Sequence, residues 1–409
     1  MTNLPQGWEW KSLGEIFNIE RGGSPRPIKE FLTDKEDGIN WIKIGDIKNQ
    51  KYLYKTEEKI IQEGLKKSKL VIEGDLLVSN SMSFGKPVIV KLQKGAIHDG
   101  WLLLKEKINL NKEYFYYLFS SNFMYNFLSY QASGSTVKNL NIDKLKQIEI
   151  PLPQLKEQER IVGILDESFS KIDESIKILE QDLLNLDELM QSALQKAFNP
   201  LKDNAKENYK LPQGWEWKSL EEISEINPRN KIDDNINVSF ISMDKILDGY
   251  SNDFSYKVKK WKEVKKGFTH FKQGDIGVAK ITPCFENRKS VIFDKLENGF
   301  GAGTTELHII RANESVYSKF LLWFFKTEWF IQNGILNMTG ATGHKRISKD
   351  FIKSLQIPLP PLKEQEQIAS HLDELSSHVK NLKQNYQAQI KDLQELKNSL
   401  LDKAFKGNL

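Results

Sequence analysis

Two stretches of the sequence decide how this chain is organised. Residues 4–13 read LPQGWEWKSL, and residues 211–220 repeat the same ten letters 207 positions later. The same offset joins two further pairs of stretches: IPLPQLKEQERI at 150–161 with IPLPPLKEQEQI at 357–368, and LQKAF at 194–198 with LDKAF at 401–405. A fixed offset of this kind indicates two copies of one structural unit.

Between these anchors the two copies diverge almost completely. Residues 21–29 read RGGSPRPIK, whereas the second copy offers NPRNKIDDN at 227–235. A repeated framework with different content suits a protein that presents two recognition surfaces on similar scaffolds. An ordinary gene duplication whose loops have drifted would leave the same pattern, so the repeat by itself keeps both interpretations open.

Each copy begins with a β-rich domain and ends with a long helix. Short apolar runs broken by glycine turns, such as WIKIGDI from Trp41 and VSFISM from Val238, predict strands. Aromatic segments from Tyr114 and from Phe320 are too long for strands and predict buried helices. We therefore expect an α+β chain with five parts: recognition domain 1 at 1–153, a helix at 154–198, a linker at 199–210, recognition domain 2 at 211–360 and a helix at 361–405.

The two helical segments carry heptad seams, in which apolar residues recur at alternating steps of three and four. Representative seam positions, which we expect to pack as a coiled coil, are Leu165, Ile172, Leu179, Leu186, Leu372, Val379, Tyr386 and Leu393. Two equivalent copies related by a pseudo-twofold axis would pair these helices antiparallel. Packing of each helix on a separate partner protein is the alternative.

Composition bounds the class of protein. The 409 residues are long enough for two to four domains, and their 39% hydrophobic content is enough for real cores. The single cysteine, Cys284, has no disulfide partner, which favours a reducing compartment. The first ten residues lack the pattern of a signal peptide, and the longest apolar runs are too short to cross a bilayer. We expect a cytoplasmic protein that does not contact membranes.

The sequence offers no recognisable catalytic constellation. There is no G-x-x-x-x-G-K-[ST] loop for ATP and no Asn-Pro-Pro-aromatic motif of adenine methyltransferases. The six histidines show no metal-ligand spacing, and Cys284 has no histidine nearby in sequence. We therefore expect no catalytic residue, no metal site and no cofactor in this chain.

The order of these motifs resembles the specificity subunit of type I restriction-modification systems. The resemblance covers the whole chain and depends mainly on the duplicated PLP-x-L-K-E-Q motif followed by heptads. Within the variable domains, IEGDLLVSNSMSFGKPVIV from Ile72 and KQGDIGVAKITPCFENRK from Lys272 resemble the family's Gly-Asp strand and the loop after it. GAGTTELHIIR from Gly301 resembles the family's G-S-T-E-x-x-V-x-R stretch, with departures at 302–304.

The resemblance implies a function and a set of partners. Two target recognition domains, inverted relative to each other, would each read one half of a bipartite sequence in double-stranded DNA. The helices would dock two methyltransferase subunits, which bind S-adenosylmethionine, and the assembly could recruit restriction subunits, which use ATP and Mg²⁺. The specificity subunit itself would perform no reaction, which agrees with the missing motifs.

DNA recognition needs cations for phosphates and polar loop side chains for base edges. In the first domain the candidates are Arg21, Arg26 and Lys29, in a Gly/Pro-rich loop with little else to hold it, and Ser79, Asn80, Ser83 and Lys86. In the second domain they are Arg229, Lys231, Lys280, Thr282, Arg288, Lys289, His344, Lys345 and Arg346. A solvated surface position is the competing interpretation for each of them.

The near-zero net charge of +4 conceals a segregation of charge. Residues 154–198 carry 5 basic and 10 acidic side chains, and residues 361–405 carry 6 and 7, so the rest of the chain has a net charge of +10. Basic domains on acidic helices favour DNA binding by the domains. Two alternatives remain at this point: a coiled-coil adaptor without DNA specificity, and a nuclease built from scattered carboxylates.

Overall fold

The computed structural model describes residues 4–47, 50–80, 85–132, 140–199, 210–341 and 343–409. The chain divides into two compact units, which we treat separately. The first contains residues 1–178 and 388–409, and the second contains residues 179–387. Both long helices, α6 (Leu155–Ala197) and α13 (Leu362–Phe405), contribute one part to each unit. The predicted linker at 199–210 falls almost entirely outside the described residues, and the predicted domain limits stay predictions.

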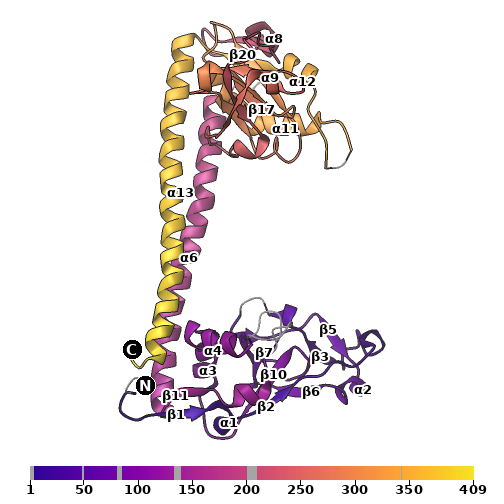
Figure 1. Cartoon of the computed structure of the whole chain (residues 1–409), viewed down its shortest axis with the longest axis vertical. Coiled ribbons are helices and arrows are strands. Elements are labelled where there is room, and N and C mark those ends of the chain that lie inside the picture. Colours follow the sequence, from indigo (N-terminus) through magenta and orange to yellow (C-terminus); the bar gives the residue numbers. More distant parts are fainter. Residues whose placement is uncertain (1–3, 48–49, 81–84, 133–139, 200–209, 342) are drawn as a thin grey trace. The chain divides into compact units, whose positions relative to one another are not determined.

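The first unit is an α+β domain with short strands. Its strands are β1 (Trp8–Ser12), β2 (Phe17–Arg21), β3 (Ile39–Ile42), β4 (Tyr52–Leu53), β5 (Glu58–Ile60), β6 (Lys69–Ile72), β7 (Leu76–Ser79), β8 (Pro87–Val90), β9 (Lys94–Ile97), β10 (Trp101–Glu106) and β11 (Glu149–Pro153). Its shorter helices are α1 (Leu13–Ile16), α2 (Gln62–Leu65), α3 (Lys112–Ser120), α4 (Asn122–Ala132) and α5 (Ile142–Lys146). Figure 1 shows α3 and α4 between α6 and the sheet that contains β7 and β10.

The second unit repeats this order of elements. Its strands are β12 (Glu216–Ser219), β13 (Ser224–Ile226), β14 (Asn237–Ile241), β15 (Lys257–Lys260), β16 (Thr269–Lys272), β17 (Ile276–Ala279), β18 (Ser290–Ile292), β19 (Phe300–Gly303), β20 (Leu307–Ala312) and β21 (Gln356–Leu359). Its shorter helices are α8 (Leu220–Ile223), α9 (Trp261–Val264), α10 (Ser318–Phe325), α11 (Glu328–Leu336) and α12 (Lys349–Ser354). The aromatic segments are helices, as predicted, and each is broken into two; α3 and α10 are largely buried, whereas Tyr125 and Phe127 of α4 are exposed.

Each unit contains two larger sheets and one two-stranded ribbon; both larger sheets of the first unit are mixed, whereas in the second unit one is mixed and one is antiparallel. In the first unit the strand orders are β2-β10-β7-β8-β4, β5-β3-β9-β6 and β1-β11. In the second they are β13-β20-β17-β18, β15-β14-β19-β16 and β12-β21. The repeated WEWKS therefore pairs antiparallel with the repeated IPLP in each unit. The repeated anchors of the sequence meet in space and close each domain.

The Gly-Asp motif forms the same turn in both units. Gly74 and Gly274 both have φ +86, a left-handed conformation that glycine adopts without a steric penalty. The following carboxylates accept backbone N–H groups across the turn, Asp75 from Ile72 at 2.9 Å and Asp275 from Lys272 at 2.8 Å. This turn leads β6 into β7 and β16 into β17.

A buried glutamine explains why LKEQE is repeated. In the first unit the Gln158 amide accepts the N–H of Asn111 and donates to the carbonyl of Pro153, both at 2.9 Å. In the second unit Gln365 accepts the N–H of Tyr317 at 2.9 Å and donates to the carbonyl of Pro360 at 2.8 Å. Both glutamines are almost fully buried. Each long helix is therefore tied to the strand before it and to the loop that enters the buried aromatic helix.

An aspartate eight residues after each glutamine makes a second contact between the long helix and its domain. Asp166 binds the Lys51 ammonium at 2.7 Å and accepts the Tyr117 hydroxyl. Asp373, 207 residues later, binds the Lys319 ammonium at 2.7 Å and accepts the indole N–H of Trp323 at 2.9 Å. The helix positions are equivalent, whereas the partners supplied by the two domains differ.

The two long helices run antiparallel where they meet within each unit. In the first unit the Lys397 ammonium binds Asp173, and Arg160 donates to the carbonyl of Leu409 at 2.9 Å. In the second unit Lys383 binds Asp187 at 2.5 Å. The predicted α+β fold with antiparallel helices is confirmed.

Burial of the predicted seam varies along the helices. Leu165, Ile172, Leu186, Leu372 and Val379 are buried, and the other three predicted positions, Leu179, Tyr386 and Leu393, are half-buried. Leu165 belongs to the core of the first unit, and Leu186, Leu372 and Val379 belong to that of the second. Much of the seam is therefore covered by the chain's own domains. A partner-docking role for these residues stays a prediction.

Candidate DNA interface

Two candidate side chains of the first unit, Arg21 and Arg26, converge on Asp99 together with Ser24, which was not a candidate. The Nε of Arg21 donates to the carbonyl of Asp99 at 3.0 Å, and the Ser24 hydroxyl donates to its Oδ1 at 3.1 Å. Arg26 lies 3.8 Å from Oδ2 of the same carboxylate and keeps 83% of its side chain exposed. Lys29 is exposed nearby, in a short 3-10 helix (Ile28–Glu30).

The loop that carries these residues is held firmly, contrary to the expectation from its composition. The N–H of Gly22 donates to Trp101 at 2.9 Å, and that of Gly23 donates to Ile97 at 3.2 Å. A Cβ on Gly22 would lie 2.2 Å from the carbonyl oxygen of His98, and one on Gly23 would lie 2.4 Å from that of Lys67. Only glycine permits this close approach of backbones. Strand β2 extends to Arg21, so this side chain starts from a strand rather than from a loop.

The second candidate loop of the first unit meets the same turn. The N–H of Asn80 donates to the carbonyl of Gly100 at 2.7 Å, and its carbonyl accepts the N–H of Leu140 at 3.2 Å. Ser79 is buried, with its hydroxyl accepting the N–H of Lys86 at 2.9 Å, and Lys86 is exposed. Ser83 lies outside the described residues. The turn at 98–100 thus joins both candidate loops into one surface, which we call the first loop edge.

The first loop edge is hollowed beside Arg26. A hollow of about 780 Å³ opens there between residues 24–28, the ends of β3 and β5, and His98. The Trp41 ring lies beneath it, and Lys43, paired with Glu58 at 3.0 Å, lines it. The hollow is therefore lined by both cations and apolar side chains, and its cations are of the kind that contact DNA phosphates.

The second unit has an equivalent loop edge built by the same backbone bonds. Lys280 replaces Asn80, because its N–H donates to the carbonyl of Glu306 at 3.0 Å and its carbonyl accepts the N–H of Ile347 at 2.9 Å. Thr282 donates its N–H to Lys345 at 3.1 Å. The structure therefore brings together four candidates from two segments of the chain: Lys280, Thr282, Lys345 and Arg346.

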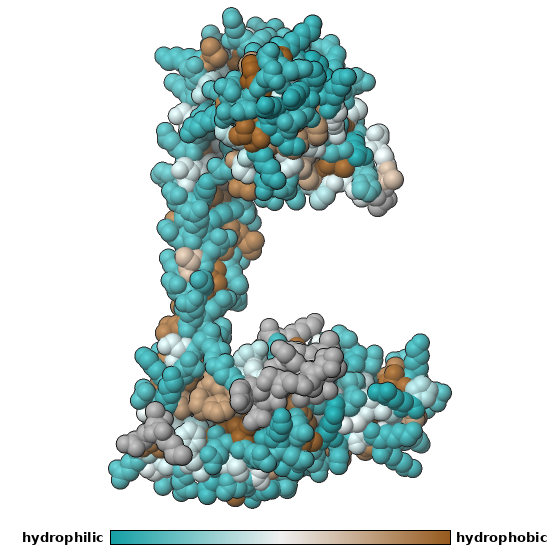
Figure 2. Space-filling view, viewed as in Figure 1, coloured by the Kyte–Doolittle hydropathy of each residue, from teal (hydrophilic) through white to brown (hydrophobic). Residues whose placement is uncertain are grey.

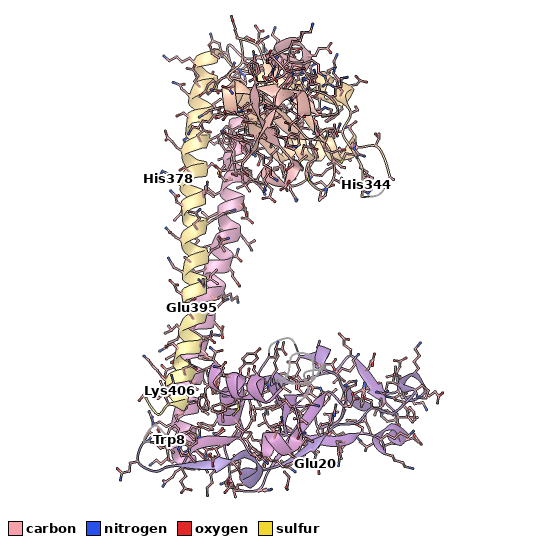
Figure 3. All side chains as sticks on the ribbon, viewed as in Figure 1. Trp8, Glu20, His344, His378, Glu395 and Lys406 are labelled. Atoms are coloured by element: carbon pink, nitrogen blue, oxygen red, sulfur yellow. The ribbon has the colours of Figure 1, made fainter. Side chains whose placement is uncertain are left out.

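An ion pair fixes the base of the second candidate segment. Arg346 binds Glu306 through two hydrogen bonds of 2.8 and 2.9 Å, which hold the pKa of this carboxyl below its usual value. His344 and Lys345 are exposed beside it, and Figure 3 shows His344 on an extended loop of the second unit. The exposed side chains of His344 and Lys345 therefore lie beside a residue that this ion pair holds in place.

Arg229 lies against the same edge from another segment. Its guanidinium donates to the carbonyl of Phe268 at 3.0 Å and lies 3.3 Å from Nε2 of His270. Burial lowers the pKa of His270, and the charge of Arg229 lowers it further. Thr269, between Phe268 and His270, donates its hydroxyl to the carbonyls of Gly303 and Thr304 at 3.2 and 2.9 Å. Lys231 is exposed in the segment that follows Arg229.

The side chains of Arg288 and Lys289 bind groups within the second unit and not the turn at 304–306. Arg288 binds Glu328 and the carbonyl of Lys326 and lies over the Tyr250 ring, with 17% of its side chain exposed. Lys289 donates to the carbonyl of Met243 at 3.3 Å. The fully buried Lys326 donates to three carbonyls, and burial lowers its pKa to about 7. A DNA-binding role for Arg288 and Lys289 stays a prediction, and their contacts favour a structural one.

The turn residues Asp99 and Glu306 were absent from the sequence-based candidates. Asp99 follows β9 and Glu306 follows β19. At each turn a backbone carbonyl accepts the N–H of the residue after β7 or β17. Glu306 lies in the GAGTTELHIIR stretch, which resembles a stretch of the family, whereas IHDG at 97–100 carries no such resemblance. Only the pairing of strands far apart in sequence identifies the first turn.

The described residues contain no group of three or more His, Cys, Asp or Glu side chains placed to hold a metal ion. Across the same part of the chain, no helix is both long and apolar enough to span a membrane.

The fold and the two loop edges define a class: duplicated α+β proteins that present two variable loop surfaces on one framework. The family described as Type I restriction modification DNA specificity domain matches residues 5–184 and 212–392. The chain belongs to this family.

Individual relatives agree. The chain is 43% identical over 218 residues to the EcoAI specificity subunit of Escherichia coli, covering 52% of this chain and 37% of that protein. It is 22% identical over 425 residues to the StySPI specificity subunit of Salmonella potsdam, covering 99% and 90%. The alignments with the EcoAI and EcoEI subunits span only about a third of those proteins, at 37% and 33%.

Solved structures share the fold. A chain from a study of complex assembly and conformational transition of the type I R-M system matches with a TM-score of 0.77 at 20% identity, over the full length of both chains. The HsdS subunit from Thermoanaerobacter tengcongensis matches with a TM-score of 0.61 at 21% identity, over 100% of this chain and 98% of that one.

Proposed function

We propose that this chain is the DNA specificity subunit of a type I restriction-modification complex, in which each loop edge reads one half of a bipartite target in double-stranded DNA. The observation that carries the proposal is the repeated loop edge with changed content. Asn80 and Lys280 occupy the same hydrogen-bonded position in the two units, as do the turns at 98–100 and 304–306. A conserved backbone with different side chains is what two different half-sites require.

The chemistry of each edge supports contact with DNA. Arg26, Lys231 and Lys345 present exposed cations, which suit phosphates. Arg26 can also bind a guanine edge through two hydrogen bonds. The Arg26 to Asp99 separation of 3.8 Å is long for an ion pair, so the guanidinium can turn toward a ligand at little cost. Arg346 is already bound to Glu306 and would position its neighbours instead.

The helices would dock two methyltransferase subunits, and restriction subunits would join this assembly. Exposed apolar side chains occur on both helices, namely Ile178, Leu184, Leu189, Leu382 and Leu396. Figure 2 shows hydrophobic surface, coloured brown, on the helical part of the chain. In this proposal the chain catalyses no reaction and acts in the cytoplasm. S-adenosylmethionine belongs to the methyltransferase subunits, and ATP and Mg²⁺ belong to the restriction subunits.

Single-molecule methylation mapping tests the proposal. Cells that express the chain with its methyltransferase subunit should methylate one bipartite motif. Replacing Lys280 and Lys345 by alanine should reduce methylation, or relax the sequence preference, at only one half-site, because both lysines lie on the second loop edge. Lys272→Ala is the matched control, since Lys272 is exposed at the opposite end of β16. Methylation without a bipartite motif, or DNA binding without sequence preference, would favour an adaptor. Metal-dependent cleavage by the purified chain alone would reveal a nuclease.

A further inference from the structure

A dense run of lysines lies on the second unit outside all the candidate segments described above. Residues 257–266 read KVKKWKEVKK and form strand β15 followed by helix α9. Four of the six lysines are exposed, and together they are called the lysine ridge: Lys257, Lys260, Lys262 and Lys266. Among the described residues none of the four has a carboxylate within ion-pair distance.

The other two lysines hold the segment in place. The ammonium of Lys259 lies 4.2 Å from the centre of the Phe240 ring, and Lys265 binds Asp234 at 2.6 and 2.8 Å. Trp261 is buried beneath the segment and donates its backbone N–H to Ile236 at 2.9 Å. The ridge is therefore a set of free cations on a fixed backbone. Like charges so close together repel one another unless an anion is near.

The first unit shows that the fold does not need these charges. In the paired strands Glu58 faces Trp41 as Lys257 faces Phe240, so residues 58–67 correspond to residues 257–266. The first segment has three lysines and two glutamates, whereas the second has six lysines and one glutamate. Glu58 itself is bound to Lys43. The same strand and short helix form with a nearly neutral sequence.

The lysine ridge continues the second loop edge. Phe268 lies two residues after Lys266, and its carbonyl accepts a hydrogen bond from Arg229. The N–H of Lys262 donates to the carbonyl of Asp234 at 3.0 Å. The segment that leads away from Arg229 and Lys231 therefore runs beside the ridge. A duplex held at the loop edge carries one negative charge per ~1.7 Å of its axis, so phosphates beyond the bases that are read can reach these lysines.

We propose that the lysine ridge binds phosphates of the DNA flanking the second half-site, so that the second domain has a longer footprint than the first. This inference depends on the proposed function. The competing explanation is that Lys257 and Lys260 only protect the edge strand β15 from pairing with another chain. That explanation leaves out Lys262 and Lys266, which lie beyond the strand.

The test compares the full chain with a variant that carries Lys→Gln at all four ridge positions. Binding is measured from 50 to 200 mM salt on a long duplex and on a duplex that ends at the second half-site. The variant should bind the long duplex about 10- to 100-fold more weakly at low salt, with a salt slope smaller by roughly 2 to 4. Its recognition sequence should not change, and the short duplex should bind both proteins alike. Matched Lys→Arg changes should retain the slope.

A variant that keeps the wild-type slope and affinity on the long duplex would overturn the inference and leave edge protection as the role of these lysines. Loss of a protein partner with unchanged DNA binding would overturn it as well and assign the ridge to that partner. Either result can occur while the chain still recognises a specific sequence. If the wild-type chain shows no sequence preference on any duplex, the proposed function itself fails.

Discussion

Replacing Gln365 by alanine should destabilise the second unit selectively. The Gln365 side chain makes three hydrogen bonds, to the N–H of Tyr317 and to the carbonyls of Ser315 and Pro360, at 2.8 to 3.1 Å. A hydrogen bond of this kind contributes about 1 kcal/mol to stability, and the lost methylene adds about 0.8 kcal/mol. The expected loss in the free energy of unfolding is therefore about 3 to 4 kcal/mol.

Calorimetry can measure this loss in the full chain. For a unit of this size the change should lower the temperature of its thermal transition by roughly 10 °C. Hydrogen exchange would show faster opening of the backbone around Tyr317 and no change around Asn111, which depends on Gln158 instead. Gln387→Ala, on the exposed face of the same helix and within the second unit, should alter stability by no more than about 0.5 kcal/mol. Equal effects of the two substitutions would refute the reasoning.

Three further predictions concern the site and the helices. Arg26→Ala should weaken DNA binding and leave thermal stability unchanged, whereas Arg288→Ala should lower the melting temperature because it releases Glu328 and Lys326; reversed effects would contradict the roles assigned to them. Because the pKa of Glu306 is lowered in the folded protein, its ion pair with Arg346 stabilises the fold at pH values above the usual carboxyl pKa, and this stabilisation is lost as pH falls through the lowered pKa. Arg346→Met should therefore reduce the dependence of the melting temperature on pH in the acid range. Seven residues inserted after Leu186, with seven after Lys383 to keep the helices matched, should lengthen the spacer between half-sites; an unchanged spacer in methylation mapping would disprove a ruler role.

The organisation of the chain could be predicted because it depends on local pattern and repetition. The repeat located both domains and both helices, and heptad spacing marked the residues of the seam. The aromatic runs from Tyr114 and Phe320 are helical, as their spacing indicated, and their first helices, α3 and α10, are largely buried. Such features depend on neighbouring residues and therefore remain visible in a linear sequence.

The candidate site was less predictable because its contacts are distant in sequence. Arg26 and Arg288 look alike as basic residues in loops, yet only the structure places Glu328 beside Arg288, 40 residues away. Asp99 lies 78 residues from Arg21 and became visible as a shared partner only when β2 paired with β10. Gln158 and Gln365 were recognised as part of a repeated motif, but their role requires the backbone groups that they meet.

The contacts of these two glutamines bear on how the domains can change over evolutionary time. Each amide binds the domain only through main-chain atoms, which every residue supplies except that proline lacks the N–H. The attachment of a domain to its helix at this point therefore places no demand on the side chains that the domain carries. New loop sequences, or a whole replacement domain with the same chain path, can be accepted without redesign of the joint. Specificity can thus diversify while the assembly that uses it stays constant.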